Sequence, residues 1–287
     1  MSHDSQFQLL RQRRFLPLFL TQFLGAFNDN VFRNALIILI AFRASEISGW
    51  DSNTLINLAA GLFILPFFLF SASAGQLADK YEKGLLIRRV KLLEIGIMIL
   101  AALSLRSGEV IWLILLLFLM GTQSSLFGPL KYGILPQHLD ETELTGGNGL
   151  IEMGTFLAIL FGTLAGGLLI GLEQIGPQSV AFTVVTVAIL GYLVSHGIPL
   201  AAPVASGLKI NWNPVTETWR NLKFLSSNRT VFLSVLGISW FWFLGGAYLA
   251  QLPNYTRLTL GGNEQVVTLL LTLFSIGIGL GSLLCER

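Results

Sequence analysis

Long apolar segments separated by short polar connections run through most of this chain. The first extends over about 28 residues from Phe15 to Phe42, roughly 42 Å of α-helix at 1.5 Å per residue, which suits a tilted membrane span. Seven more apolar segments follow, so the pattern predicts eight membrane-spanning helices. The seven are Leu55–Ala74, Leu92–Leu105, Val110–Leu130, Gly146–Leu172, Val180–Ile198, Val231–Leu252 and Val266–Leu284.

A polar island interrupts the first apolar segment at membrane depth. Residues 28–34 contain one acid, one base and three amides, namely Asp29, Arg33, Asn28, Asn30 and Asn34. A charged side chain facing lipid costs about 2.5–3.5 kcal/mol even on the lenient insertion scale, so such residues usually face a bundle interior or a wet cavity. Asp29 and Arg33 are spaced i, i+4 and share one helix face within pairing reach. They could form an internal ion pair that merely permits insertion, but the amides favour a polar binding surface.

The composition indicates a polytopic helical membrane protein, since 53% of the residues are apolar, 12% are charged and the mean hydropathy is +0.69. Cys285 is the only cysteine, which excludes an intramolecular disulfide. His3, His138 and His196 lie far apart in sequence, so no metal site is expected. The sequence contains no glycine-rich nucleotide loop and no Ser/His/Asp set, so neither catalysis nor a cofactor is expected.

Lysine and arginine residues are distributed by membrane side, which predicts a cytoplasmic N-terminus. One side collects fourteen of them and the other side three, with Arg33 left out because it lies inside the membrane. The net charge of +2 hides this asymmetry. A nucleic-acid partner is not expected, because the basic residues do not cluster on one soluble face. The fourteen are Arg11, Arg13, Arg14, Lys80, Lys83, Arg88, Arg89, Lys91, Lys131, Lys209, Arg220, Lys223, Arg229 and Arg287, and the three are Arg43, Arg106 and Arg257.

The polar stretch Leu200–Arg229 divides the chain into three parts. Residues 1–199 are expected to form a six-helix bundle, residues 200–229 a cytoplasmic linker, and residues 230–287 the first two helices of a second bundle. Within the linker, Trp212–Phe224 mixes aromatic and polar residues and predicts an interfacial helix along the inner leaflet. This layout resembles the major facilitator superfamily, in which two six-helix halves built from three-helix inverted repeats enclose a midplane site.

The loop Gly75–Gly84 resembles the signature loop of that superfamily. Gly75 is expected to allow close helix approach and Asp79 to sit at a neighbouring helix N-terminus, while Lys80 and Lys83 pair across a cytoplasmic gate. The usual Gly-Arg-Arg/Lys ending is replaced by Glu82-Lys83-Gly84, and a generic basic turn is the alternative. Gly277, Gly279 and Gly281 resemble the start of the equivalent loop in a second half, so the chain is interpreted as truncated from twelve helices.

Three further segments, Phe23–Asn30, Gly128–Pro136 and Gly147–Glu152, together resemble the bacterial lysophospholipid transporters. The likeness is closest to versions fused to a 2-acylglycerophosphoethanolamine acyltransferase and an acyl-carrier-protein synthetase. The resemblance implies inward flipping of lysophosphatidylethanolamine-like lipids across the bacterial inner membrane by alternating access. Reacylation would then take place in the cytoplasmic leaflet.

The residues agree with a cargo that has a polar headgroup and an apolar tail. Asp29 could meet an ammonium group, Arg33 or Lys131 a phosphodiester, and the phenylalanine-rich spans an acyl chain. Lys131 and Glu152 lie towards the cytoplasmic ends of their helices, where they either pair as a gate or touch substrate. The full candidate binding set is Asp29, Asn30, Arg33, Asn34, Lys131, Asn148 and Glu152.

The sequence is also compatible with two other functions. A membrane platform for a downstream acyltransferase would need no charges in the bilayer, whereas a proton-coupled multidrug or small-molecule exporter would use Asp29 and Glu152 as protonation sites.

The small residues Gly162 and Gly166 predict either a close helix contact or a bending point.

Overall fold

The computed structural model describes residues 6–47, 52–262 and 264–284, and all regular structure in these ranges is helical. Helices lie at all eight segments expected to span the membrane, and a further helix, α7, lies at the expected interfacial segment. The helices are η1 Gln6–Arg11, α1 Leu16–Ile47, α2 Ser52–Lys80, α3 Lys83–Ser107, α4 Val110–His138, η2 Glu141–Glu143, α5 Leu144–Ile170, α6 Gly176–Ser195, α7 Pro214–Ser226, α8 Arg229–Leu258 and α9 Glu264–Leu284.

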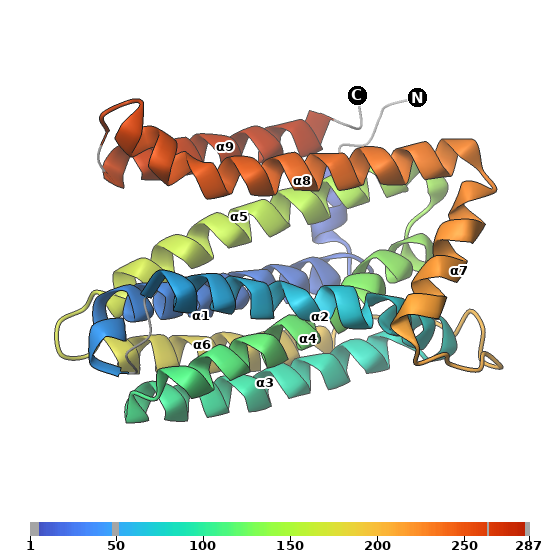
Figure 1. Ribbon diagram of the computed structural model, residues 1–287. Coiled ribbons are helices and arrows are strands. Elements are labelled where there is room, and N and C mark those ends of the chain that lie inside the picture. The colour runs from blue at the N-terminus through green and yellow to red at the C-terminus, as the bar shows by residue number, and fades with distance from the viewer. Residues whose placement is uncertain (1–5, 48–51, 263, 285–287) are drawn as a thin grey trace.

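Six of these helices, α1, α2, α4, α5, α6 and α8, are long and apolar enough to cross a membrane. The protein is therefore a multi-pass membrane protein. Helix α3 is less apolar because its first half carries Lys83, Arg88, Arg89, Lys91 and Glu94, and α9 contributes the shorter apolar stretch Leu269–Ser282. Figure 1 shows the long helices running side by side, whereas α7 crosses the end of the bundle.

Packing within α1–α6 follows an internal symmetry. The main contacts are α1 with α5, α2 with α4, α3 with α6, α1 with α6, and α3 with α4. Exchanging α1 with α4, α2 with α5 and α3 with α6 maps this set of pairs onto itself. Because the two three-helix units start from opposite ends of the bundle, they are related as inverted repeats, as expected for this architecture.

The contact between α1 and α5 depends on two glycines. A Cβ atom at Gly162 would lie 2.4 Å from the Phe27 carbonyl oxygen, and one at Gly166 would lie 2.5 Å from the Val31 carbonyl oxygen. Both neighbours are backbone atoms, so neither can move aside without shifting a helix. The prediction of a close helix contact at Gly162 and Gly166 is thus confirmed.

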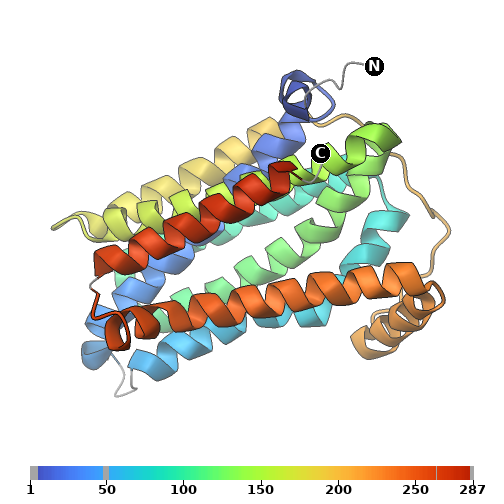
Figure 2. The ribbon, with the colours of Figure 1, turned by 90° about the horizontal axis from the view of Figure 1, so that it is seen from above.

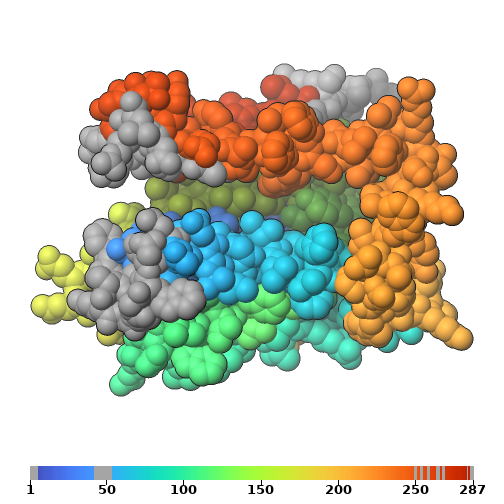
Figure 3. Space-filling view, viewed as in Figure 1, coloured from blue at the N-terminus to red at the C-terminus, as the bar shows by residue number. Residues whose placement is uncertain are grey.

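Helices α8 and α9 form a hairpin beside the six-helix bundle. They meet near their connecting turn and diverge towards the other end, while α9 lies along α5 (Figure 2). Trp242 of α8 stacks on Phe156 of α5 with ring centroids 5.8 Å apart, and Phe274 of α9 stacks on Tyr248 of α8 at 5.6 Å. On the face seen in Figure 3, a hollow separates α8 from α2, with α5 at its floor.

Candidate functional site

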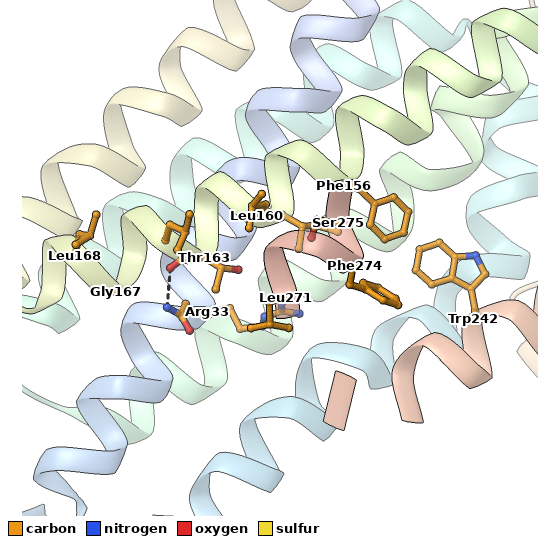
Figure 4. Close-up of a pocket in the computed structure, with 13 residues that line it drawn as sticks. Arg33, Phe156, Leu160, Thr163, Gly167, Leu168, Trp242, Leu271, Phe274 and Ser275 are labelled. Carbon is orange, nitrogen blue, oxygen red and sulfur yellow. Dashed lines mark hydrogen bonds between the residues drawn. The ribbon is translucent and has the colours of Figure 1, made fainter. Parts of the chain in front are cut away.

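A cavity with a volume of about 610 Å³ lies between α1, α5, α8 and α9. Its wall is mostly apolar and includes the aromatic side chains Phe156, Trp242 and Phe274 at one end (Figure 4). Arg33 and Asn34 of α1 and Thr163 of α5 supply the polar part of the wall. A mostly apolar cavity with a few convergent polar groups is typical of a site for an amphipathic molecule.

Arg33 is the charged residue of this cavity wall. Its Nη2 donates a 2.6 Å hydrogen bond to Asn30 Oδ1, and its guanidinium lies 5.5 Å from the centre of the Phe63 ring. Among the described residues, no carboxylate lies within ion-pair distance of Arg33. Pairing of Asp29 with Arg33, which their i, i+4 spacing allows, is therefore absent in this conformation. The positive charge of Arg33 is left for an anionic group in the cavity.

Asn30 and Asn34 hold the backbone of the polar island in place. Asn34 Nδ2 donates a 2.7 Å hydrogen bond to the carbonyl oxygen of Thr163, which ties α1 to α5 at the cavity wall (Figure 4). Asn30 Nδ2 donates a 2.7 Å bond to the Ala26 carbonyl oxygen, while its Oδ1 accepts from Arg33. Asn30 thus orients the guanidinium, and Asn34 lines the cavity itself.

A second polar cluster, which we call the Glu94 network, is buried where α1, α3 and α4 meet. The side chains of Lys91 and Glu94 are each only 1% exposed and form an ion pair of 2.6 Å between Lys91 Nζ and Glu94 Oε2. Asn28 Nδ2 donates to Glu94 Oε1 at 2.9 Å, and Gln123 Nε2 donates to Glu94 Oε2 at 3.2 Å. Three donors from three helices thus satisfy this carboxylate, as a buried charge requires.

Asp29 belongs to this network rather than to the cavity wall. Its Oδ2 lies 2.5 Å from Ser124 Oγ, and Ser124 Oγ also lies 3.0 Å from Gln123 Oε1. Gly25 makes room for the neighbouring ammonium group, because a Cβ there would lie 2.4 Å from Lys91 Nζ. The polar island therefore contributes to two separate sites, the cavity and the Glu94 network.

Lys131 and Glu152 lie towards the ends of α4 and α5 that η2 connects, but they are not within ion-pair distance of each other. Lys131 Nζ is 3.4 Å from Thr155 Oγ1, and Glu152 accepts a hydrogen bond from the Tyr132 hydroxyl. Asn148 is exposed and donates to the Leu144 carbonyl oxygen of its own helix. None of these three candidates lines the 610 Å³ cavity.

The Gly75–Gly84 loop differs in detail from its expected roles. A Cβ atom at Gly75 would have open space around it, so close approach does not require this glycine. The Asp79 side chain is exposed, and it makes no hydrogen bond or ion pair within the described part of the chain. Glu82 is instead the carboxylate that caps a helix, because it accepts from the backbone N–H groups of Gly84 and Leu85 at the start of α3.

The two lysines of this loop do not pair across a gate in this conformation. Lys80 lies over the Tyr81 ring at 5.7 Å. Lys83 is 1% exposed, its Nζ has no hydrogen-bond partner among the described residues, and its side chain packs next to Gly133 of α4.

The start of the linker is bound tightly to this end of the bundle. Glu82 Oε1 also accepts from the Ala201 N–H at 2.8 Å, and the Asp79 carbonyl oxygen accepts from Val204 and Ala205 at 2.9 and 2.8 Å. Gln76 exchanges two hydrogen bonds with the Asn211 backbone, at 2.7 and 3.0 Å. The linker is thus attached to α2 and α3 from residue 201 to residue 211.

Sequence reasoning missed the residues of the Glu94 network other than Asn28 and Asp29 of the polar island. The distribution of basic residues predicts that Lys91 lies on the cytoplasmic side, whereas the structure buries it as the partner of Glu94. The spacing Lys91-x-x-Glu94 inside an apolar helix was the available signal, because i, i+3 ion pairs lie on one helix face. Gln123 and Ser124 gave no comparable signal, since their role depends on contacts between helices.

The chain matches the family model described as Major Facilitator Superfamily over residues 18–287. It therefore belongs to the major facilitator superfamily, in agreement with its inverted three-helix repeats. Among curated proteins, it is 29% identical over 278 residues to the lysophospholipid transporter LplT of Serratia proteamaculans (strain 568), covering 95% of this chain and 65% of the relative. It is 31% identical over 266 residues to the protein of that name from Escherichia coli O7:K1 (strain IAI39 / ExPEC), covering 91% and 62%.

A third relative is the lysophospholipid transporter LplT of Enterobacter sp. (strain 638), which is 28% identical over 263 residues and covers 91% of this chain. The chain thus spans slightly less than two thirds of the length of these relatives.

Proposed function

We propose that the protein is a secondary transporter that moves lysophospholipid across a bacterial inner membrane by alternating access. The observation that carries the proposal is the cavity, in which the uncompensated guanidinium of Arg33 faces the same space as Phe156, Trp242 and Phe274. A phosphodiester would pair with Arg33 and an acyl chain would contact the apolar wall. The names of the relatives support this cargo over that of a drug exporter.

Within this proposal the candidate residues take different roles. Arg33 and Asn34 contact the headgroup and Asn30 positions Arg33, because only the first two line the cavity. Lys131, Asn148 and Glu152 lie nearer the inner ends of α4 and α5 and would meet cargo on its way to the cytoplasmic leaflet. Asp29 acts from behind the cavity wall, through the network described above.

The uptake of labelled lysophosphatidylethanolamine by the full-length protein in proteoliposomes tests the proposal. Replacing Arg33→Ala should lower uptake by roughly tenfold or more, since a charge-assisted hydrogen bond contributes about 1.5–3 kcal/mol. The matched control is Arg106→Ala, because Arg106 is exposed at the end of α3, a helix that contributes no residue to the cavity wall. Equal uptake by both variants at equal protein levels would contradict the proposal.

A cytoplasmic N-terminus is part of the same proposal and rests on the distribution of lysine and arginine. It places the Gly75–Gly84 loop inside and the α5–α6 connection outside. Cysteines introduced at Tyr81 and Glu173, both exposed, would report the two sides. An impermeant thiol reagent applied to intact cells should label position 173 and spare position 81, and the reverse pattern would overturn the topology.

The inner end of the bundle is proposed to act as the gate. Gly75, Asp79, Lys80 and Lys83 belong to a loop that joins α2 to α3, and the linker is hydrogen-bonded to this loop through Glu82 and the Asp79 carbonyl group. A few charge-assisted contacts can bias a two-state equilibrium by a few kcal/mol. Release of the linker would therefore favour opening towards the cytoplasm.

Helix α7 is proposed to lie in the membrane interface on the cytoplasmic side. It crosses the end of the bundle (Figure 1), and Val215, Trp219 and Leu222 form an exposed apolar stripe at helical spacing. Glu217 on another side of the helix is buried and binds Arg220. A reacylating acyltransferase, fused or associated, is the partner we expect next to this surface, since reacylation of the imported lipid takes place in the cytoplasmic leaflet.

A further inference from the structure

The carboxyl groups of Asp29, which is partly buried, and Glu94, which is buried, lie on different helices and are joined by a continuous chain of close polar contacts. Asp29 Oδ2 on α1 lies 2.5 Å from Ser124 Oγ, which lies 3.0 Å from Gln123 Oε1 on the same helix α4. Gln123 Nε2 then lies 3.2 Å from Glu94 Oε2 on α3. Each of these distances is a hydrogen-bond distance, so each contact needs a hydrogen atom between its two heavy atoms.

The available hydrogen atoms do not suffice if both carboxyl groups are ionised. The Ser124 hydroxyl has a single hydrogen, whereas an ionised Asp29 and the oxygen of Gln123 can only accept. Ser124 can therefore serve one of its two contacts and leaves the other as two facing acceptors. A hydrogen on Asp29 removes the conflict, because Asp29 then donates to Ser124 and Ser124 donates to Gln123.

The alternative orientation of the Gln123 amide leads to the same count. The oxygen and nitrogen of an amide are assigned from their hydrogen bonds, so both orientations have to be considered. If the amide is turned over, Gln123 donates to Ser124 and Ser124 donates to an ionised Asp29. The Gln123 oxygen then faces Glu94 Oε2, and this contact needs a hydrogen on Glu94. In either orientation the network holds one proton on one of its two carboxyl groups.

The charge balance of the site agrees with this count. Within the Glu94 network itself, Asp29, Glu94 and Lys91 carry a net charge of zero when one carboxyl group is protonated and −1 when neither is. Arg33 is not counted, because its guanidinium binds Asn30 and faces the cavity. A buried cluster with no net charge costs less to desolvate. Asp29 Oδ1 is also buried without a hydrogen-bond partner within the described residues, which is less costly for a neutral carboxyl group than for a carboxylate.

We propose that Asp29 and Glu94 form a proton-binding site that holds a single shared proton through Ser124 and Gln123. In the amide orientation described, the proton resides on Asp29, since Glu94 already accepts from Lys91, Asn28 and Gln123. The site is separate from the cargo cavity, and the proposal does not depend on which molecule the protein transports.

The charged groups close enough to act on Asp29 are Glu94 and Lys91 of α3 and Arg33 of α1. The helices packed against α1 contribute few other charges. These are Asp79 and Lys80 at the end of α2, Lys131 in α4 and Glu152 in α5, with Arg11 in η1 and the titratable His138 at the far end of α4, while α6 has none within Gly176–Ser195.

The shared proton has a consequence for Arg33, one helical turn from Asp29. While Asp29 is neutral, Arg33 has no nearby carboxylate partner and faces the cavity. When the proton leaves, the network carries a charge of −1, and Arg33 gains an i, i+4 carboxylate partner. The proton and an anionic group in the cavity should therefore favour each other's binding.

Infrared spectroscopy of the full-length protein in lipid at pH 7 tests the shared proton directly. We expect a carbonyl stretching band of a protonated carboxylic acid that shifts when aspartate is labelled with carbon-13. Ser124→Ala should move this band, because the carboxyl group loses its hydrogen-bond partner, and Asp29→Asn should remove it. Glu109→Gln, at an exposed residue before α4, is the control and should leave the band unchanged.

A band that shifts with labelled glutamate and also responds to Ser124→Ala would place the shared proton on Glu94 and still support the site. The isotope labels assign the band to aspartate or glutamate in the wild-type protein, so this part of the test needs no substitution. The absence of any carboxylic acid band that responds to Ser124→Ala would show that both groups are ionised and would overturn the proposal.

Discussion

Two sides of the same polar island differ in how completely their groups are partnered. Asn28 and Asp29 face α3 and α4, where Glu94, Lys91 and Gln123 complete a buried network. Arg33 and Asn34, within the next two turns, face a cavity, and Arg33 has an amide and an aromatic ring as neighbours but no carboxylate. The difference teaches that one short segment can supply both the internal framework of a bundle and its binding surface.

Electrostatics explains why the two sides are kept apart. On the network side, opposite charges lie at 2.6 Å and are buried, so removing one partner leaves the other uncompensated. On the cavity side, the uncompensated charge is tolerable because water or a ligand can reach it. Substitutions on the first side should therefore affect folding most, and substitutions on the second side binding.

The largest effect is expected for Lys91→Met. Breaking a buried ion pair by removing one partner typically costs about 3–5 kcal/mol, because the remaining charge has no counterion. The double variant Lys91→Met/Glu94→Gln should recover much of that loss. Unfolding of the purified protein by a detergent titration measures both. If the single and double variants were equally stable, the ion pair would not hold this region together.

A smaller loss is expected for Gly162→Ala at the α1–α5 contact. The added Cβ would meet the backbone carbonyl of Phe27 at 2.4 Å, and overpacking of this kind typically costs about 1–3 kcal/mol. Gly96→Ala is the matched control, since its Cβ would have open space and alanine favours a helix. The same detergent titration should rank wild type and Gly96→Ala together. A Gly162→Ala protein as stable as both would argue against close packing here.

The pH dependence of lysolipid binding distinguishes the two sides functionally. A proton on the Asp29–Glu94 site leaves Arg33 free, so the affinity for lysophosphatidylethanolamine should rise as the pH falls. Coupling between two sites typically changes affinity by roughly fivefold or more. Asp29→Asn should remove this dependence and also slow uptake, because Arg33 can no longer be drawn from its ligand. If Asp29→Asn kept the wild-type pH dependence of binding, Asp29 would not be coupled to ligand binding at Arg33.

The smallest effect is expected at the connection between α2 and α3, where Glu82 and Asp79 can be compared directly. Glu82→Gln should weaken the cap of α3 by about 1 kcal/mol. The backbone N–H groups of Gly84, Leu85 and Ala201 donate hydrogen bonds to the Glu82 carboxylate, so their hydrogen exchange should become faster. Asp79→Asn should leave these amides unchanged, because its side chain is exposed. Faster exchange only in Asp79→Asn would show that Asp79, and not Glu82, caps α3.

The helices could be predicted from the sequence because their signal is local. Each expected span is a long apolar run, and α7 follows from the mixture of aromatic and polar residues over Trp212–Phe224. The close approach at Gly162 and Gly166 was also predictable, since paired small residues at this spacing commonly mark helix contacts. Gly75 carried a similar expectation from its loop, yet it has open space because no helix backbone approaches it.

The division of the polar island could not be predicted, because it depends on contacts between helices. The sequence places Asp29 and Arg33 on one helix face, and no local sequence pattern reveals the hydrogen bond between Ser124 and Asp29. Lys91 lies in a basic segment of the sequence, and its burial is evident only in the structure, where both it and Glu94 are 1% exposed. Contacts between helices, such as those of Ser124 with Asp29 and of Asn28 with Glu94, thus decide which side of the polar island is structural and which faces the cavity.

The central claim, that Arg33 receives the anionic part of an amphipathic cargo, is tested most directly by comparing two ligands with the same acyl chain. Lysophosphatidylethanolamine carries a phosphodiester and a monoacylglycerol does not. Binding of both to the full-length wild type and to Arg33→Gln would be measured in detergent. The account predicts that the wild type prefers the lysophospholipid and that Arg33→Gln loses this preference while still binding the monoacylglycerol. An unchanged preference in Arg33→Gln would contradict it.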